Sequence, residues 1–163
     1  MKNKIVILKP AYGNGGIGIT KVSHSQRNLK SLITKYIKSF DSNPIVVQKF
    51  LPNYIKGDKR IILLGGAPIG AVLRVPAKNE IRSNFHAGGT AKKTNLTQRD
   101  KFICQSIKKF LLKNKLYFVG IDIIDGYLTE INITSPTGIH EINKMNNVKL
   151  EEKVINYFLK KIN

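Results

Sequence analysis

The sequence is short of acidic residues, cysteine and long apolar runs. Its 163 residues include 28 Lys and Arg but only 10 Asp and Glu, which gives a formal net charge of +18. The single cysteine, Cys104, excludes an intramolecular disulfide framework, so we expect a reducing, cytoplasmic environment. No apolar run approaches the ~20 residues of a membrane-spanning helix, so no membrane partner is expected. A hydrophobic fraction of 42% still predicts a folded core.

The excess of positive charge invites a nucleic-acid interpretation, but the type and spacing of the basic residues disfavour it. Only five of the 28 basic residues are Arg, the residue best suited to base edges and bidentate phosphate contacts. No run of five or six basic residues occurs, and no basic stripe is interleaved with aromatic residues. Nucleic acid is therefore disfavoured as the primary ligand, and an anionic small molecule explains the charge equally well.

Hydrophobic periodicity predicts an α+β protein with a mostly antiparallel sheet. Strands are expected at 5–8 and 45–51, hairpins over 60–75 and 117–133, and helices over 29–40, 98–114 and 151–162. Ser23 or Ser25 is available as the N-cap of the first helix, and Thr97 with Asp100 predicts a capping box before the second. Residues 76–94 show no periodicity, which is typical of a functional loop or lid.

A glycine-rich loop follows the first predicted strand and its lysine, Lys9. Gly13, Gly15 and Gly18 match the pattern Gly-x-Gly-x-x-Gly, but no second parallel strand carries an acid about 20 residues later. A dinucleotide-binding fold is therefore disfavoured. The backbone N–H groups of such a loop, together with a lysine, suit a polyphosphate. An ordinary flexible turn explains the loop equally well.

The scarce carboxylates gather on the predicted hairpin 117–133. Asp122 lies three residues before the Asp-Gly turn at 125–126 and Glu130 four residues after it, so the two should be near cross-strand neighbours. Glu130 and Asn132 leave the strand on the same side. Two carboxylates and an amide oxygen suit Mg²⁺, which takes phosphates as further ligands. We favour such a site over a solvated polar face, because unpaired neighbouring acids repel each other.

Two other segments offer guanidinium and hydroxyl groups. Asp58 and Arg60 alternate onto one face of the first hairpin, and Arg74 lies on its partner strand. Two guanidinium groups would stabilise a transferring phosphoryl group, although a surface ion pair of little energetic value explains them better when they are taken alone. Segment 134–138 offers hydroxyl and N–H groups at a helix start, which suits either a carboxylate ligand or a plain N-cap.

Taken together, these segments resemble the ATP-grasp ligases, and closely the bacterial glutathione synthetases. The similar stretches are, in chain order, 7–18, 48–52, 57–60, 73–76, 81–89, 118–124 and 128–137. The last stretch separates this family from other ATP-grasp ligases better than the glycine loop does. The resemblance implies an ATP-grasp domain over 1–163, with antiparallel sheets flanked by helices and a mobile loop at about 76–94. We expect the family's N-terminal domain to be absent.

The resemblance also implies a role for each matched residue. The residues expected to hold ATP are Lys9, Gly13, Gly15, Gly16, Gly18, Gln48, Lys49, Phe50, Leu51 and Asp58. The expected ligands of two Mg²⁺ ions, with Mn²⁺ as an alternative metal, are Asp122, Glu130 and Asn132. The residues expected to contact the dipeptide or product are Arg60, Arg82, Ser135 and Thr137. The expected catalytic residues are Arg74, at the transferring phosphate, and Arg60.

The implied reaction joins γ-glutamylcysteine to glycine. ATP phosphorylates the C-terminal carboxylate of the dipeptide, and the amine of glycine attacks the acyl phosphate to give glutathione, ADP and phosphate. The implied partners are these small molecules, and a separate chain with the N-terminal half and a homo-oligomer are left open. Two other interpretations also stay open: another ATP-grasp amino-acid ligase, and a non-catalytic basic remnant that binds nucleotide or nucleic acid. We expect weak Mg-ATP binding by the chain alone and turnover only with a second polypeptide.

Overall fold

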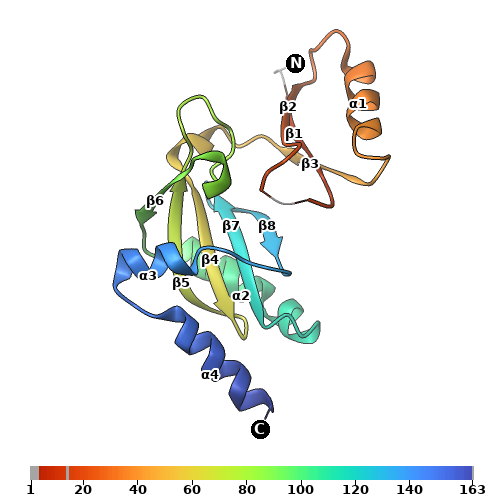
Figure 1. Cartoon of the computed structure of the whole chain (residues 1–163). Coiled ribbons are helices and arrows are strands. Elements are labelled where there is room, and N and C mark those ends of the chain that lie inside the picture. The colour runs from red at the N-terminus through yellow and green to blue at the C-terminus, as the bar shows by residue number, and fades with distance from the viewer. Residues whose placement is uncertain (1–3, 14, 163) are drawn as a thin grey trace. The chain divides into compact units, whose positions relative to one another are not determined.

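The structure is a computed structural model that describes residues 4–13 and 15–162 (Figure 1). The chain forms two compact units, Met1–Pro52 and Asn53–Asn163, each with its own sheet and core. All strand pairs in both sheets are antiparallel, as the sequence predicts. The assignment of 1–163 to a single domain stays a prediction.

The first unit is a three-stranded sheet packed on one helix. Its strands are β1 (Ile5–Pro10), β2 (Thr20–Ser23) and β3 (Ile45–Lys49), in the order β2-β1-β3, and helix α1 (Leu29–Lys38) connects β2 to β3. Because side chains alternate along a strand, Val6 and Leu8 pack with α1 while Lys9 lies on the other face. Strand β2 was not expected, because only one of its four residues, Val22, is a buried apolar side chain.

Helix α1 begins without the serine cap that the sequence suggests. Its N-cap is Asn28, and no side chain caps the helix, so both Ser23 and Ser25 are wrong as caps. Ser23 ends β2 instead, and its hydroxyl oxygen lies 2.8 Å from that of Ser25. The helix itself is predicted correctly because its apolar side chains recur at helical spacing and Tyr36 is buried against the sheet.

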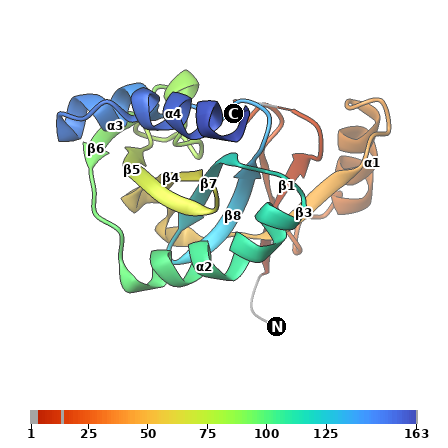
Figure 2. The same ribbon diagram turned by 90° about the horizontal axis from the view of Figure 1, so that it is seen from below.

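The second unit is a five-stranded sheet with helices on both faces. Its strands are, in the order of the sheet, β6 (Thr90–Lys93), β5 (Ala67–Val75), β4 (Asp58–Leu64), β7 (Phe118–Ile124) and β8 (Tyr127–Asn132). Helix α2 (Gln98–Lys113) covers one face, and α3 (Ile139–Asn146) and α4 (Leu150–Ile162) lie on the other (Figure 2). Two short 3₁₀ helices are η1 (Pro52–Lys56) and η2 (Phe85–Ala87). No helix within the described residues has the length and apolar character needed to span a membrane.

The central strands are apolar on both sides because both faces of the sheet are buried. Ile61 of β4 packs in one core with Ile103 of α2, whereas its neighbour Ile62 packs in the other core with Ile142 of α3 and Leu150 of α4. A strand covered on both faces has a continuous apolar run rather than strict alternation. The buried thiol of Cys104 belongs to the α2 core, where it packs among apolar side chains.

Both predicted hairpins are confirmed by their turns. Gly65 and Gly66 have φ of 58° and 73°, and Asp125 and Gly126 have φ of 51° and 73°. Two successive positive φ values are what the favoured two-residue hairpin turn requires. Segment 76–94 differs from expectation, because it contains η2 and the paired strand β6. Its mobility stays a prediction.

The capping box at the start of α2 is confirmed and yields a test. Thr97 Oγ1 accepts from the N–H of Asp100 at 3.1 Å, and the Asp100 carboxylate accepts from the N–H of Thr97 at 2.8 Å. Thr97→Ala should lower the free energy of unfolding by about 1 kcal/mol, because it removes a cap acceptor. Urea denaturation measures the change. Ser25→Ala is the matched control and should stay within about 0.5 kcal/mol, as for surface sites; equal losses would contradict the assignment.

Candidate functional site

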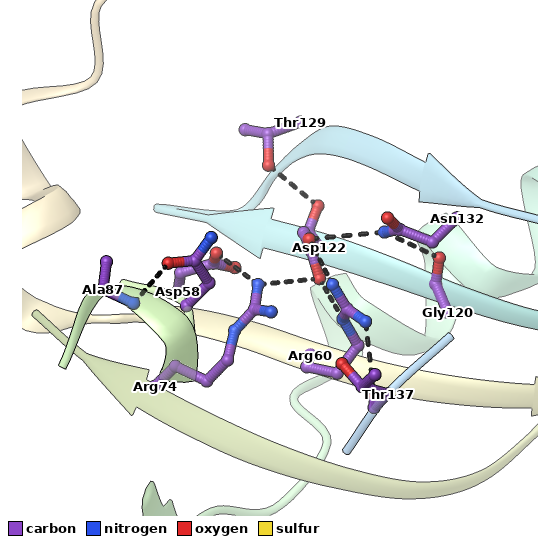
Figure 3. Close-up of polar contacts among 10 residues, drawn as sticks. Asp58, Arg60, Arg74, Ala87, Gly120, Asp122, Thr129, Asn132 and Thr137 are labelled. Carbon is purple, nitrogen blue, oxygen red and sulfur yellow. Dashed lines mark hydrogen bonds and ion pairs between the residues drawn. The ribbon is translucent and has the colours of Figure 1, made fainter. Parts of the chain in front are cut away.

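A group of charged side chains is buried on one face of the five-stranded sheet (Figure 3). Arg60 of β4 is the cross-strand partner of Asp122 of β7, and Asp58 of β4 is that of Arg74 of β5. Opposite residues of an antiparallel pair point to the same face. Because Ile62, two residues after Arg60, packs with α3, the group lies on the α3 side of the sheet. The exposed fractions of the four charged residues are only 2–9%.

The four side chains form one network around the Asp122 carboxylate. Arg60 donates from Nε to Oδ1 at 2.5 Å and from Nη2 to Oδ2 at 2.9 Å, a bidentate pair. Arg74 Nη2 lies 3.0 Å from Asp122 Oδ1 and 2.5 Å from Asp58 Oδ2. The alternative of a surface ion pair is therefore wrong, because these charges are desolvated and each guanidinium is held by a carboxylate.

The two carboxylates of the network differ in pKa. Burial alone would raise the pKa of Asp122, but Arg74 and Arg60 hold it below its ordinary value. Burial and repulsion from Asp122 raise the pKa of Asp58 to about 7, against the lowering effect of Arg74 and Arg60. Within the described residues, Asp58 Oδ1 and Arg74 Nε have no hydrogen-bond partner. Asp58 is thus the carboxylate that is less well compensated for its burial.

The three predicted cation ligands lie together on β7 and β8. Asp122 and Glu130 are direct cross-strand partners, and Asn132 Nδ2 is 3.4 Å from Asp122 Oδ2. The register shifts after Asp122, so Thr129 is an extra residue on β8, and its hydroxyl donates to the Asp122 carbonyl at 3.1 Å. This bulge explains why residues three before and four after the turn face each other.

The donor set fits a hard divalent cation in its chemistry and placement. Two carboxylates and an amide oxygen are oxygen ligands of the kind that Mg²⁺ takes. No cluster of three His, Cys, Asp or Glu side chains occurs in the described part of the chain, so the amide of Asn132 would be needed as the third ligand. Glu130 is exposed and Asp122 is buried, so the set reaches from the protein interior to the surface.

Arg60 also holds the segment between β8 and α3. Its Nη1 donates to the main-chain carbonyl of Thr137 at 3.1 Å. The N-cap of α3 is Gly138, and no side chain caps the helix, so the plain N-cap explanation for the hydroxyls of this segment is wrong. Ser135 and Thr137 are exposed. Their contact with a substrate carboxylate stays a prediction.

Arg82 lies in segment 76–94 and is paired locally. Its Nη2 is 2.7 Å from Glu80 Oε2, and its Nε donates to Glu80 Oε1 at 3.1 Å. Hydrogen bonds from Arg82 lower the pKa of Glu80 to about 2. The contact of Arg82 with the dipeptide stays a prediction.

The predicted nucleotide residues of the first unit share one small sheet. Lys9 on β1 is opposite Val46, and Gln48 on β3 is opposite Ile7, so Lys9 and Gln48 lie on the same face, away from α1. Lys49 lies on the other face by the same alternation. The remaining predicted residues, Phe50 and Leu51, follow β3, and the ring of Phe50 lies 4.3 Å from Lys21 Nζ.

The glycine loop is packed at its C-terminal end. Gly15, Gly16 and Gly18 have φ of 63°, 72° and 83°. A Cβ on Gly18 would lie 2.5 Å from the ring of Phe40, and Tyr36 donates its hydroxyl hydrogen to the Gly18 carbonyl at 2.7 Å. Residue 14 lies outside the described residues. This end of the loop is therefore fixed to α1, and its binding of phosphate stays a prediction.

The pKa of Asp58 predicts a stability that depends on pH. An acid whose pKa is raised by folding binds its proton more tightly in the folded state, so it costs stability as pH rises from about 4 to about 7. One titrating group changes the free energy of unfolding by at most about 1.4 kcal/mol per pH unit. Without divalent cations, wild type should lose stability relative to Asp58→Asn across this range in chemical denaturation. Parallel curves for the two proteins would contradict the raised pKa.

Asp100 supplies a control of opposite sign. Burial alone would raise its pKa, but hydrogen bonds from Lys59 and Thr97 lower it. An acid with a lowered pKa contributes stability above its unfolded pKa and loses it as pH falls. Relative to Asp100→Asn, wild type should therefore gain stability as pH rises through the acidic range.

Known proteins match this chain over most of its length. A family described as "Prokaryotic glutathione synthetase, ATP-grasp domain" matches residues 1–147. The glutathione synthetase of Agrobacterium fabrum is 50% identical over 139 residues, which cover 85% of this chain and 43% of that protein. The glutathione synthetase of Thermosynechococcus vestitus is 46% identical over 151 residues, which cover 93% of this chain and 47% of that protein. The chain thus spans about half the length of these relatives.

Solved structures agree on the fold. The D-cycloserine synthetase DcsG matches 99% of this chain and 57% of its own with a TM-score of 0.72 at 11% identity. The D-alanine–D-alanine ligase of Bacillus anthracis, solved with ATP, matches 96% of this chain and 53% of its own with a TM-score of 0.63 at 15% identity. At such identities these structures show the ATP-grasp fold alone. The family match and the close relatives go further: this chain belongs to the prokaryotic glutathione synthetase family and carries its ATP-grasp domain.

Proposed function

We propose that the chain is the ATP-grasp part of a carboxylate–amine ligase of the glutathione synthase type. One observation carries the proposal: Asp122, Glu130 and Asn132 come together on adjacent strands, beside two buried arginines, in a chain of this family. Oxygen ligands next to guanidinium groups suit the phosphates of a nucleotide bound with a divalent cation.

The proposed reaction has two steps. The γ-phosphoryl group of ATP passes to a carboxylate oxygen of γ-glutamylcysteine, which gives an acyl phosphate and ADP. The amine of glycine then attacks the acyl carbon, a C–N bond forms, phosphate leaves and the amine loses a proton. Arg74 would stabilise charge on the transferring phosphoryl group, and Arg82, Ser135 and Thr137 would hold the dipeptide. Segment 76–94 would exclude water from the acyl phosphate.

The first unit would hold the nucleotide. Lys9 and the glycine loop would bind the phosphates, and Gln48 to Leu51 would contact adenine. Asp58, which belongs to the second unit, would face the ribose or phosphates. A bound Mg²⁺ or Mn²⁺ would neutralise charge on the phosphate oxygens. Support comes from the shared face of Lys9 and Gln48 and from the oxygen donors of β7 and β8.

Binding of nucleotide with a cation can be tested on the chain alone. Mg-ATP at millimolar concentration should raise the melting temperature, because a ligand that binds only the folded state stabilises it. Glu130→Gln should remove most of the shift. Glu130 is the best residue to change, because it is exposed, whereas Asp122 is buried and paired with both arginines. Thermal unfolding with and without Mg-ATP provides the measurement.

Asp125→Asn is the matched control, because Asp125 is an exposed acid at the turn of the same hairpin. This variant should keep the wild-type shift. Absence of any shift in wild type at millimolar ATP would argue against a nucleotide site in this chain, and equal shifts in wild type and Glu130→Gln would argue against the cation ligands.

Turnover should require more polypeptide than this chain. Because the chain spans about half the length of its relatives, we propose that polypeptide outside these 163 residues supplies the rest of the site. The purified 163-residue chain should therefore release little phosphate from ATP with γ-glutamylcysteine and glycine. Formation of glutathione by these residues alone, detected by mass spectrometry, would refute the requirement for further polypeptide.

The acyl and amine substrates are tested by a panel. With the further polypeptide present, phosphate release across several acyl acceptors and amines would separate a glutathione synthase from another ATP-grasp ligase. A non-catalytic basic module would instead show salt-sensitive binding to nucleic acid and no stabilisation by Mg-ATP.

A further inference from the structure

Arg60 connects two parts of the proposed site that are distant in sequence. Three of its nitrogens donate hydrogen bonds: Nε and Nη2 bind the Asp122 carboxylate, and Nη1 binds the Thr137 carbonyl. The planar fork of a guanidinium presents donors on three nitrogens, whereas an ammonium presents its three donors from a single nitrogen. With an exposed fraction of 5%, Arg60 is almost fully enclosed by these partners.

Two glycines leave the space that this side chain occupies. A Cβ on Gly120 would lie 3.2 Å from Arg60 Nη1 and 2.8 Å from Pro136 Cβ, and a Cβ on Gly138 would lie 3.2 Å from Arg60 Cγ. Gly138 also has φ of 120°, which other residues rarely adopt. Arg60 therefore lies in a slot formed between β7 and the segment before α3.

The contact of Arg60 with this segment is to its main chain. Residues 133–138 form neither strand nor helix in the described structure, and the Ser135 and Thr137 side chains are exposed. Arg60 can therefore fix the direction of the segment without occupying the hydroxyl groups proposed to bind substrate. Asn132 adds a contact beside Arg60, because its Nδ2 donates to the Gly120 carbonyl at 3.3 Å.

We propose that Arg60 is a positioning residue that couples the cation ligand Asp122 to the substrate segment 134–138. This inference rests on the proposed function. The resemblance instead predicts direct contact between Arg60 and the dipeptide, for which the two N–H groups outside these three hydrogen bonds would be needed. In the proposed role, Arg60 acts through its three hydrogen bonds, so that ordering Asp122 by cation and nucleotide also orders the segment that binds the dipeptide.

Two variants test the positioning role of Arg60, and a third variant serves as the control. Arg60→Lys keeps the charge but has one nitrogen in place of the three that contact Asp122 and Thr137. Gly138→Ala keeps the Arg60 guanidinium but adds a Cβ 3.2 Å from Arg60 Cγ at a φ of 120°, so it should displace the segment and tests the coupling if Arg60→Lys fails to fold. Arg99→Lys is the matched control. Arg99 Nε also donates to a main-chain carbonyl, that of Gly126 at 2.9 Å, in the turn between β7 and β8.

The first measurement is amide hydrogen exchange on the ligand-free chain. Both variants should accelerate exchange of the Ile142 amide several-fold, because its acceptor, the Gly138 carbonyl at 3.0 Å, follows the anchored Thr137, while Arg99→Lys leaves it unchanged. This measurement does not depend on the proposed function. Unchanged exchange in both variants would overturn the inference.

The second measurement is the coupling between two ligands. Calorimetry gives the affinity of γ-glutamylcysteine with and without Mg²⁺ and a non-hydrolysable ATP analogue. The ratio of these affinities should lie at roughly 5–150 in wild type and in Arg99→Lys, and fall to about 1 in Arg60→Lys and Gly138→Ala. A merely structural defect would weaken binding without changing this ratio. An equal loss of affinity in both conditions would indicate direct contact and overturn the inference.

The outcomes separate this inference from the proposed function. A wild-type chain that binds neither ligand overturns the proposed function. A wild-type chain that binds nucleotide but not dipeptide, or that binds both without coupling, overturns the role of Arg60 alone.

Discussion

Asp122 is the residue on which three strands of the second unit and the segment before α3 converge. Its carboxylate accepts hydrogen bonds from Arg60 of β4 and from Asn132 of β8, and it is paired with Arg74 of β5. A buried charge that loses its partner costs about 3–5 kcal/mol, so each of these side chains is constrained by the others. The chemistry proposed for this chain therefore depends on a desolvated network whose side chains hold one another in place.

The location of that network follows from strand alternation. Along β4 and β7, one set of side chains packs under α2, and the other set lies under α3 and α4. On the α3 side the apolar core continues only to Ile62, and Arg60 and Asp58 take the next two places on that face. Glycine at position 120 leaves room there for Arg60. The same register that buries the core thus places opposite charges side by side.

Much of this arrangement is predictable from local patterns. The turns at 65–66 and 125–126, the capping box of α2 and the alternation of Glu130 with Asn132 are all encoded within a few residues. Strands β2 and β6 are not predictable in this way, because they are four residues long and owe their existence to pairing with β1 and β5. The partners of Asp122 depend on a register between residues 62 positions apart. Gly120 is a signal that was available, since a glycine inside an apolar strand often marks close approach by another group.

The four buried charges of Asp58, Arg60, Arg74 and Asp122 sum to zero when all are ionised. An ionised carboxylate offers about four lone-pair positions, and those of Asp122 face Arg60 twice, Arg74 once and Asn132 once. A bare divalent cation would therefore have to displace a donor, such as Arg74, to bind Asp122. A cation that arrives on a polyphosphate brings anionic oxygens that can pair with the displaced Arg74 guanidinium. Asp122 would thus be reached more readily by a cation accompanied by its counter-charge than by a free cation.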